Sequence, residues 1–206
     1  MENTKNKQII TISVTALVTF LATSFLFSYS NFRLFGTATN TTSGNHISGL
    51  ILQDDGSASG RALVEAYGAD ESVVIGVAKR DGSYALEGLT SGSFVVVGSV
   101  LRGNYGYIGT LNLASGDNTT TLDITLSPTG TITGTVDGCD ESCVANLKYN
   151  GTSIRAESIL SDGSFVIDGV APGTYTLQVF SGNSSTTVET IVVESGGEIN
   201  LALALA

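Results

Sequence analysis

Residues 162–177 read DGSFVIDGVAPGTYTL, and a similar stretch, DGSYALEGLTSGSFVV, occupies residues 81–96. Each copy begins with Asp-Gly, a pair that favours a tight turn because glycine adopts positive φ without steric cost. Alternating apolar residues follow, such as Tyr84 and Leu86, with the period of two that is typical of a half-buried strand. A second glycine-containing turn then leads into another alternating run. Each copy therefore predicts a β-hairpin.

The arrangement Asp-Gly-Ser-Phe-x-Ile-x-Gly-Val-x-Pro-Gly-Thr-Tyr-x-Leu at residues 162–177 resembles the core motif of carboxypeptidase regulatory-like domains, which are transthyretin-like β-sandwiches. Residues 54–66 also resemble the first turn and second strand of this family. The resemblance implies two tandem seven-stranded transthyretin-like or Ig-like sandwiches, at residues 46–126 and 131–206. No catalytic residues come with this family's module, so the resemblance implies a protein that is not an enzyme.

The composition agrees with an all-β fold, since the 206 residues include 25 Gly and only 2 Pro. Ser127–Gly130 is predicted to be a linker of about four residues, because Pro128 cannot donate to a β-ladder. The last strand alternates to its end, so we expect it to be paired within a sheet; unpaired, it would be an aggregation-prone edge. The expected strands are 47–52, 61–67, 73–79, 83–89, 93–102, 105–113 and 120–126, then 131–136, 144–149, 152–157, 164–170, 174–180, 186–193 and 198–204.

The N-terminal region, residues 1–36, contains an uncharged apolar run at residues 9–27. As a helix this run would span about 28 Å, close to the thickness of a bilayer core. A secretory signal usually has a shorter apolar region and a small-x-small cleavage site, so the run favours an uncleaved membrane anchor, with a cleaved signal as the alternative. Lysines before the run place the N-terminus inside the cell. Residues 37–45 are polar and are predicted to form a flexible tether.

The chain carries a net charge of −10, which excludes some partners. A field of this sign repels nucleic acid and anionic lipid headgroups, so we expect neither to bind the folded part. His46 is the only histidine. Because a metal site needs about four ligands, and a serine triad needs a placed histidine, the sequence predicts no metal, no cofactor and no catalytic site.

Cys139 and Cys143 are the only cysteines. In an exported chain an even pair normally forms a disulfide, and this one would close a small loop near the start of the second sandwich. Free thiols are the alternative.

Two further sets of residues are candidate surface sites. Tyr105 and Tyr107 could stack on a sugar ring, or could instead form a cross-strand pair that fills a sheet face. Four asparagines match the N-glycosylation pattern, in a host that has the machinery: Asn40, Asn118, Asn150 and Asn183.

Together these features predict a non-catalytic structural or adhesive protein, anchored by residues 9–27 with its C-terminal sandwiches outside the cell. Self-association through sheet edges would make it an assembly or filament subunit. A surface polysaccharide or another protein is the expected partner. The alternative function is a carbohydrate-binding module of the cell surface, or a secreted one if the N-terminal segment is cleaved.

Overall fold

The computed structural model describes residues 32–34, 44–100, 104–116, 118–139, 143–182 and 184–205, and this part of the chain is all β. Nine strands follow a short β1 (Phe32–Leu34) in the first half: β2 (Asn45–Leu52), β3 (Ala62–Gly68), β4 (Val73–Val77), β5 (Ser83–Leu89), β6 (Gly92–Val100), β7 (Tyr105–Leu113), β8 (Thr119–Thr121), β9 (Ile124–Thr125) and β10 (Ser127–Pro128). The second half contains β11 (Gly130–Asp137), β12 (Val144–Tyr149), β13 (Thr152–Ser158), β14 (Ser164–Val170), β15 (Gly173–Ser181), β16 (Ser184–Val193) and β17 (Glu198–Ala204).

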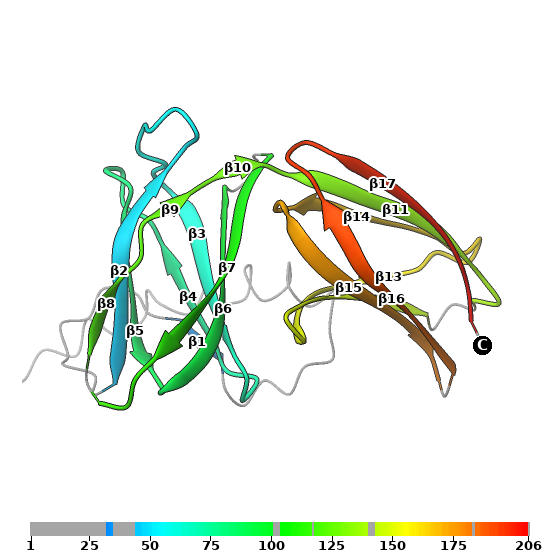
Figure 1. The fold of residues 1–206 in the computed structure, drawn as a ribbon, viewed down its shortest axis with the longest axis horizontal. Helices are drawn as coiled ribbons and strands as arrows, with labels where there is room; N and C mark the ends of the chain where they lie inside the picture. The colour runs from blue at the N-terminus through cyan, green and yellow to red at the C-terminus, as the bar shows by residue number, and fades with distance from the viewer. Residues whose placement is uncertain are drawn as a thin grey trace, which may run out of the picture.

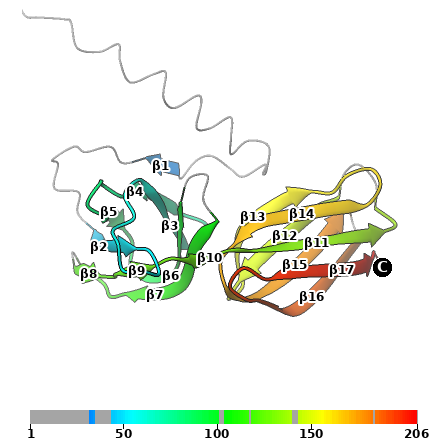
Figure 2. The ribbon, with the colours of Figure 1, turned by 90° about the horizontal axis from the view of Figure 1, so that it is seen from above.

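The strands form two sandwiches that lie side by side (Figures 1 and 2). In the first sandwich, which is made by β1 to β10, a sheet of order β1-β4-β3-β6-β7-β10 faces a sheet of order β5-β2-β8, with β9 also pairing β2. In the second, from β11 to β17, the sheets are β13-β12-β15-β16 and β14-β11-β17. In both sandwiches the first strand pairs antiparallel with the hairpin strand (β5 or β14) and parallel with the last strand (β8 and β9, or β17).

Each sandwich has a hydrophobic core of its own, made by residues that alternate along its strands. A buried tyrosine closes each core by donating its hydroxyl to a backbone carbonyl 2.6 Å away. Tyr84 donates to Leu122, and Tyr175 donates to Ala171. Removal from water raises the pKa of both hydroxyls, so both stay protonated donors at neutral pH.

The repeated Asp-Gly-Ser segments form the predicted tight turns. Asp81 Oδ1 accepts hydrogen bonds from Ser83 N and Oγ at 3.0 and 2.7 Å, and the glycine between them has φ of 80°. Asp162 and Ser164 repeat this geometry at 2.9 and 2.6 Å. The serine donors lower the pKa of both carboxyl groups, so the turns hold their negative charge well into the acid range.

Several boundaries differ from the sequence prediction. The predicted strand 120–126 is split into β8 and β9. Residue 45, the last of the predicted tether, instead begins β2. Asn45 is buried and donates its side-chain amide to the carbonyls of Thr90 and Ala114, at 3.3 and 2.9 Å. Its polar type suggested a linker, but these partners in distant turns place it inside the fold.

The junction between the sandwiches is also shorter than predicted. Ser127 and Pro128 form β10 at the edge of a sheet, where the missing N–H of proline is tolerated, and β11 starts at Gly130. Only Thr129 separates the two strands.

The predicted membrane segment, residues 9–27, lies outside the described residues. Within the described part no helix is long and apolar enough to cross a membrane.

Candidate functional site

The junction of the two sandwiches is held by hydrogen bonds on both sides. Thr129 N donates to the carbonyl of Asn104 in the first sandwich, at 2.8 Å. On the other side, Gly196 N donates to the carbonyl of Pro128 at 3.2 Å, and Thr131 N donates to that of Gly197 at 2.9 Å. Residues 128–131, the crossing segment, are therefore hydrogen-bonded to both sandwiches, unlike a flexible linker.

Small residues allow the two sandwiches to approach closely beside this segment. A Cβ on Gly106 would lie 3.4 Å from Ala171 Cβ and 3.0 Å from Thr129 Cγ2. A Cβ on Gly173 would lie 3.3 Å from Ile108 Cγ2, and Ile108 of β7 packs against the second core. These contacts give the junction an apolar centre, where burial of a side chain is stabilising.

A polar cluster lies where β3 approaches β13. Glu65 and Tyr67 of β3 interact by a side-chain hydrogen bond, and Arg155 of β13 acts on both through its positive charge. Arg155 also donates Nε to Glu157 Oε1 at 2.8 Å and Nη1 to the carbonyl of Asp168. Removal from water raises the pKa of Glu65, and burial together with the Glu65 carboxylate raises the pKa of Tyr67.

The raised pKa of Glu65 predicts a pH-dependent contribution to stability. The folded chain favours the protonated carboxyl, so the contribution is complete below the ordinary pKa of 4.5 and is lost as pH rises through the raised pKa. We expect Glu65→Gln to melt at a higher temperature than the wild type at pH 7 and at nearly the same temperature at pH 4. Glu194→Gln, at an exposed turn, is the control and should show no such difference; equal melting shifts at both pH values would contradict the assignment.

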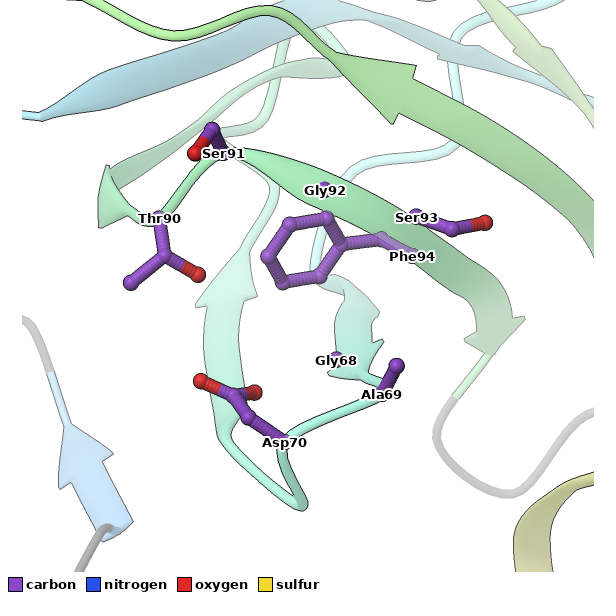
Figure 3. A pocket seen from close by; sticks show the side chains of 8 residues that line it. All are labelled: Gly68, Ala69, Asp70, Thr90, Ser91, Gly92, Ser93 and Phe94. Atoms are coloured by element: carbon purple, nitrogen blue, oxygen red, sulfur yellow. The ribbon is translucent and has the colours of Figure 1, made fainter.

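Residues of the first sandwich line a pocket with a volume of about 210 Å³. Figure 3 shows the side chains that line it. Phe94 turns its ring toward it, and Asp70 and Thr90 come from neighbouring turns. A second hollow of about 190 Å³ shares Asp70 and Thr90. Asp70 Oδ1 already accepts bonds from Ser72 N and Oγ, at 3.2 and 2.5 Å, and these bonds lower the pKa of Asp70. The pocket is therefore acidic and lined by hydroxyl groups. Its one titratable side chain, Asp70, has a lowered pKa.

Tyr105 and Tyr107, the candidate glycan-stacking residues, both lie in β7 and pack against the first core with partial exposure. The Tyr107 side chain lies over Gly109, where an added Cβ would come within 2.3 Å of its hydroxyl oxygen. This packing gives the carbohydrate-binding alternative no support, and the stacking role stays a prediction.

Cys139 and Cys143 form a disulfide with a Cα–Cα distance of 5.8 Å, between β11 and β12. Cys143 belongs to the second core, and Cys139 packs against it. The bond therefore links the end of β11 to the start of β12, whereas the first sandwich has no cysteine between β2 and β3.

We expect the Cys139→Ser/Cys143→Ser variant to lower the melting temperature of the second sandwich by several degrees. Closing so short a loop removes little unfolded-state entropy, so we expect the bond to contribute about 1–2 kcal/mol of stability. In a domain of this size each kcal/mol shifts the melting temperature by roughly 4–8 °C. The control is Cys139→Ala/Cys143→Ala, which also lacks the bond but buries no hydroxyl. A similar fall in its melting temperature would show that loss of the bond is the cause. Two free thiols in a mass spectrum of the exported protein would contradict this role.

The remaining candidates are spread over the surface. Asn118 and Asn150 are exposed, Asn150 in the turn between β12 and β13 with φ of 48°. Asn118 donates its side-chain amide to Asn45 Oδ1 at 3.4 Å. Asn40 and Asn183 lie outside the described residues, so glycosylation of all four asparagines stays a prediction. His46 lies in β2, and the described residues contain no group of three or more His, Cys, Asp or Glu placed to hold a metal ion.

The sequence did not indicate the two features that organise the junction. Glu65 and Arg155 are ordinary exposed-face positions of alternating strands, and Gly106 and Gly173 read as turn or strand glycines.

Comparisons with known proteins give distant likenesses. The chain is similar to the structure of the Bacillus anthracis TIE protein at 14% identity, covering 80% of this chain and 34% of that chain, with a TM-score of 0.35. It thus spans about a third of that structure. It is also similar to GBS52, the minor pilin of Streptococcus agalactiae, at 12% identity, covering 79% of this chain and 95% of that one, with a TM-score of 0.36. It is similar as well to the shaft pilin SpaA from Lactobacillus rhamnosus GG, at 10% identity, covering 78% of this chain and 98% of that one, with a TM-score of 0.34.

Structural similarity this low does not assign a family or a function to this chain. No curated protein matches it. One family model does match, over residues 127–201, and it is described as polysaccharide lyase family 4, domain II. The matched residues run from β10 into β17, so the second sandwich is the part of the chain that is similar to this family.

Proposed function

We propose that the chain is a non-catalytic structural protein of the cell surface, in which two tandem sandwich domains of the carboxypeptidase regulatory-like type form a short rod. Residues 9–27 hold the rod to the membrane, and the segment up to residue 44 tethers it. The observation that carries the proposal is the junction. The hydrogen bond from Thr129 to Asn104 and the one from Gly196 to Pro128, together with the contact of Ile108 with the second core, favour a fixed spacer over two independent modules.

Charge supports the same assignment. The chain is strongly acidic, with a net charge of −10, and its exposed turns hold ionised Asp81 and Asp162. Such a surface stays soluble and is repelled by anionic lipid headgroups, so the sandwiches would stand away from the membrane.

The location can be tested with the full chain in intact cells and an amine reagent that does not cross membranes. Lys79 is exposed in the first sandwich, whereas Lys5 and Lys7 precede the apolar run. We expect label on Lys79 and none on Lys5 or Lys7, with the protein retained in alkali-washed membranes. Label on both groups, or on neither, would contradict display. A soluble species beginning near Asn31 or Thr39 would identify a cleaved signal.

The spacer role can be tested by pulsed electron paramagnetic resonance on paired spin labels. One label replaces exposed Asp55 in the first sandwich, and the other replaces exposed Thr187 in the second. The control pair, Asp55 and Thr121, lies within the first sandwich. We expect distance distributions of similar width for the two pairs. A much broader distribution between the sandwiches would contradict a fixed junction.

A further inference from the structure

Edge strands of β-sheets leave a row of unpaired backbone groups, and natural proteins protect these edges by keeping them short or interrupting them with bulges. In the described part of the chain most edges have such a protection. β1, β8, β9 and β10 contain at most three residues each. The longer edge strands β5, β13, β14 and β16 each have a register shift against their neighbour.

β17 has no such protection, and neither has the part of β7 beyond Gly106, since β10 pairs only with Tyr105 and Gly106 and β7 pairs with β6 without a register shift. β17 lies at the end of the order β14-β11-β17 and pairs with β11 over seven consecutive residues, from Glu198 to Ala204, without a register shift. After Glu198 it carries no charge, since its remaining residues are Ile, Asn, Leu, Ala, Leu and Ala. A long, regular, uncharged edge is the kind that pairs with another strand.

The equivalent edge of the first sandwich is interrupted. There, Leu122 and Asp123 separate β8 from β9. Asp123 Oδ1 accepts the backbone N–H of Leu50 at 2.8 Å, and the carbonyl of Leu122 accepts the Tyr84 hydroxyl. A side chain thus replaces part of the ladder in the first sandwich, whereas the ladder is continuous in the second.

The ladder also shows which backbone groups of β17 do not bond to β11. Thr131 N donates to the carbonyl of Gly197 at 2.9 Å, and Leu205 N donates to the carbonyl of Asp137 at 3.1 Å. In a parallel ladder alternate residues bond to the same neighbour, so the odd-numbered residues of β17 face β11. The N–H and C=O groups of the even-numbered residues therefore point to the open edge. These residues are Glu198, Asn200, Ala202 and Ala204, and all four are exposed.

We propose that β17 pairs antiparallel with β17 of a second copy of this chain, which joins two three-stranded sheets into one sheet of six strands. The inference rests on the proposed surface role and names the contact through which such a protein would self-associate. A two-fold axis at Leu201 sets Asn200 opposite Ala202 of the other copy. It also sets Glu198 opposite Ala204, so no like charges meet across the pair.

The side chains support a partner of the same sequence. Leu201 and Leu203 are only partly buried at the rim of the second core. Antiparallel pairing on this axis places Leu203 of each copy beside Ile199 of the other on the same face, where both lose water contact. Because each copy is acidic, added salt should strengthen the pairing by screening the repulsion between copies.

The test measures self-association of the full chain in detergent micelles by sedimentation equilibrium. Ala202→Pro removes an N–H that β11 does not use, so it should block the edge and leave the sandwich folded. Ala202→Lys, which keeps the N–H but adds a charge, is the second variant. The control is Ala85→Lys on β5, an exposed alanine on an edge that is already bulged.

We expect Ala202→Pro to raise the dimer dissociation constant roughly ten- to hundred-fold, from two lost hydrogen bonds per pair. Ala202→Lys should weaken association in the same direction, while Ala85→Lys should match the wild type and all melting temperatures should stay close. In the wild type, amide exchange at Asn200, Ala202 and Ala204 should slow as the protein concentration rises.

Equal association of the Ala202 variants and the wild type would overturn the proposal. So would a wild type that stays monomeric at all concentrations, and so would concentration-independent protection of these amides, which would mean that another segment of the same chain covers the edge. A failure here leaves the Lys79 labelling unchanged, whereas a failure of surface display appears in the labelling alone.

Discussion

Gly49→Val is expected to unfold the first sandwich or to reduce its stability by about 3–5 kcal/mol. A Cβ at this position would lie 2.1 Å from the carbonyl oxygen of Leu122 and 2.6 Å from its carbonyl carbon, which are backbone atoms that cannot rotate away. To make room, the segment between β8 and β9 must leave β2. The hydrogen bonds to Leu122 from Tyr84 and to Asp123 from Leu50 would then break, and a buried hydroxyl would lose its partner.

The effect can be measured by thermal unfolding of the full chain, followed by hydrogen exchange at the Leu50 and Leu122 amides. A loss of about 3–5 kcal/mol is a large part of the stability of a small domain. The melting temperature of the first sandwich should therefore fall by more than about 10 °C. Gly56→Asn is the matched control, since Gly56 has φ of 80°, which asparagine tolerates, and no atom lies within 4 Å of an added Cβ. A melting temperature of Gly49→Val within a few degrees of the wild type would contradict the contact.

Leu177→Ala is expected to destabilise the second sandwich by about 2–5 kcal/mol. Leu177 is fully buried in the central strand β15, with Leu147 on one side and Val188 on the other. Truncation leaves a cavity in a core that sheets on both faces prevent from collapsing. Val192→Ala on β16 removes a comparable side chain that is 54% exposed, and should cost much less.

This variant also reports on the junction. If the packed junction couples the two sandwiches, Leu177→Ala should lower the melting of the first sandwich too, although the substitution lies outside it. Two well-separated transitions, with only the later part of the chain affected, would show that the contacts of Ile108 and Thr129 are too weak to couple the units. A destabilisation by Leu177→Ala no larger than that by Val192→Ala would contradict the core placement itself.

Local sequence was enough to predict the elements with strong periodicity and clear turn chemistry. Ser83–Leu89, Tyr105–Leu113, Val144–Tyr149, Ser164–Val170 and Glu198–Ala204 begin and end where the alternation and its flanking turns predict. The Asp-Gly-Ser turns form as expected because their hydrogen bonds join residues two apart, and neighbours in the chain need no help from the rest of the fold. The all-β class follows from the same local signals.

Contacts between distant residues decided the rest. Asn45 reads as tether but is buried, because its partners Thr90 and Ala114 lie in turns far along the chain. The expected strand 120–126 is broken, because Asp123 reaches across to the N–H of Leu50. The expected linker is almost absent, because Pro128 pairs with Tyr105 at the edge of a sheet in the first sandwich.

The alternating pattern at the end of the chain shows the same division. By itself the sequence determined that residues 198–204 form a strand with one apolar face, since that depends only on the period of two. Only the tertiary structure decided that this strand lies at an edge, in register with β11 and without a bulge. The period of two fixes which side chains share a face, whereas the partner strand and the edge position depend on which strands meet in space.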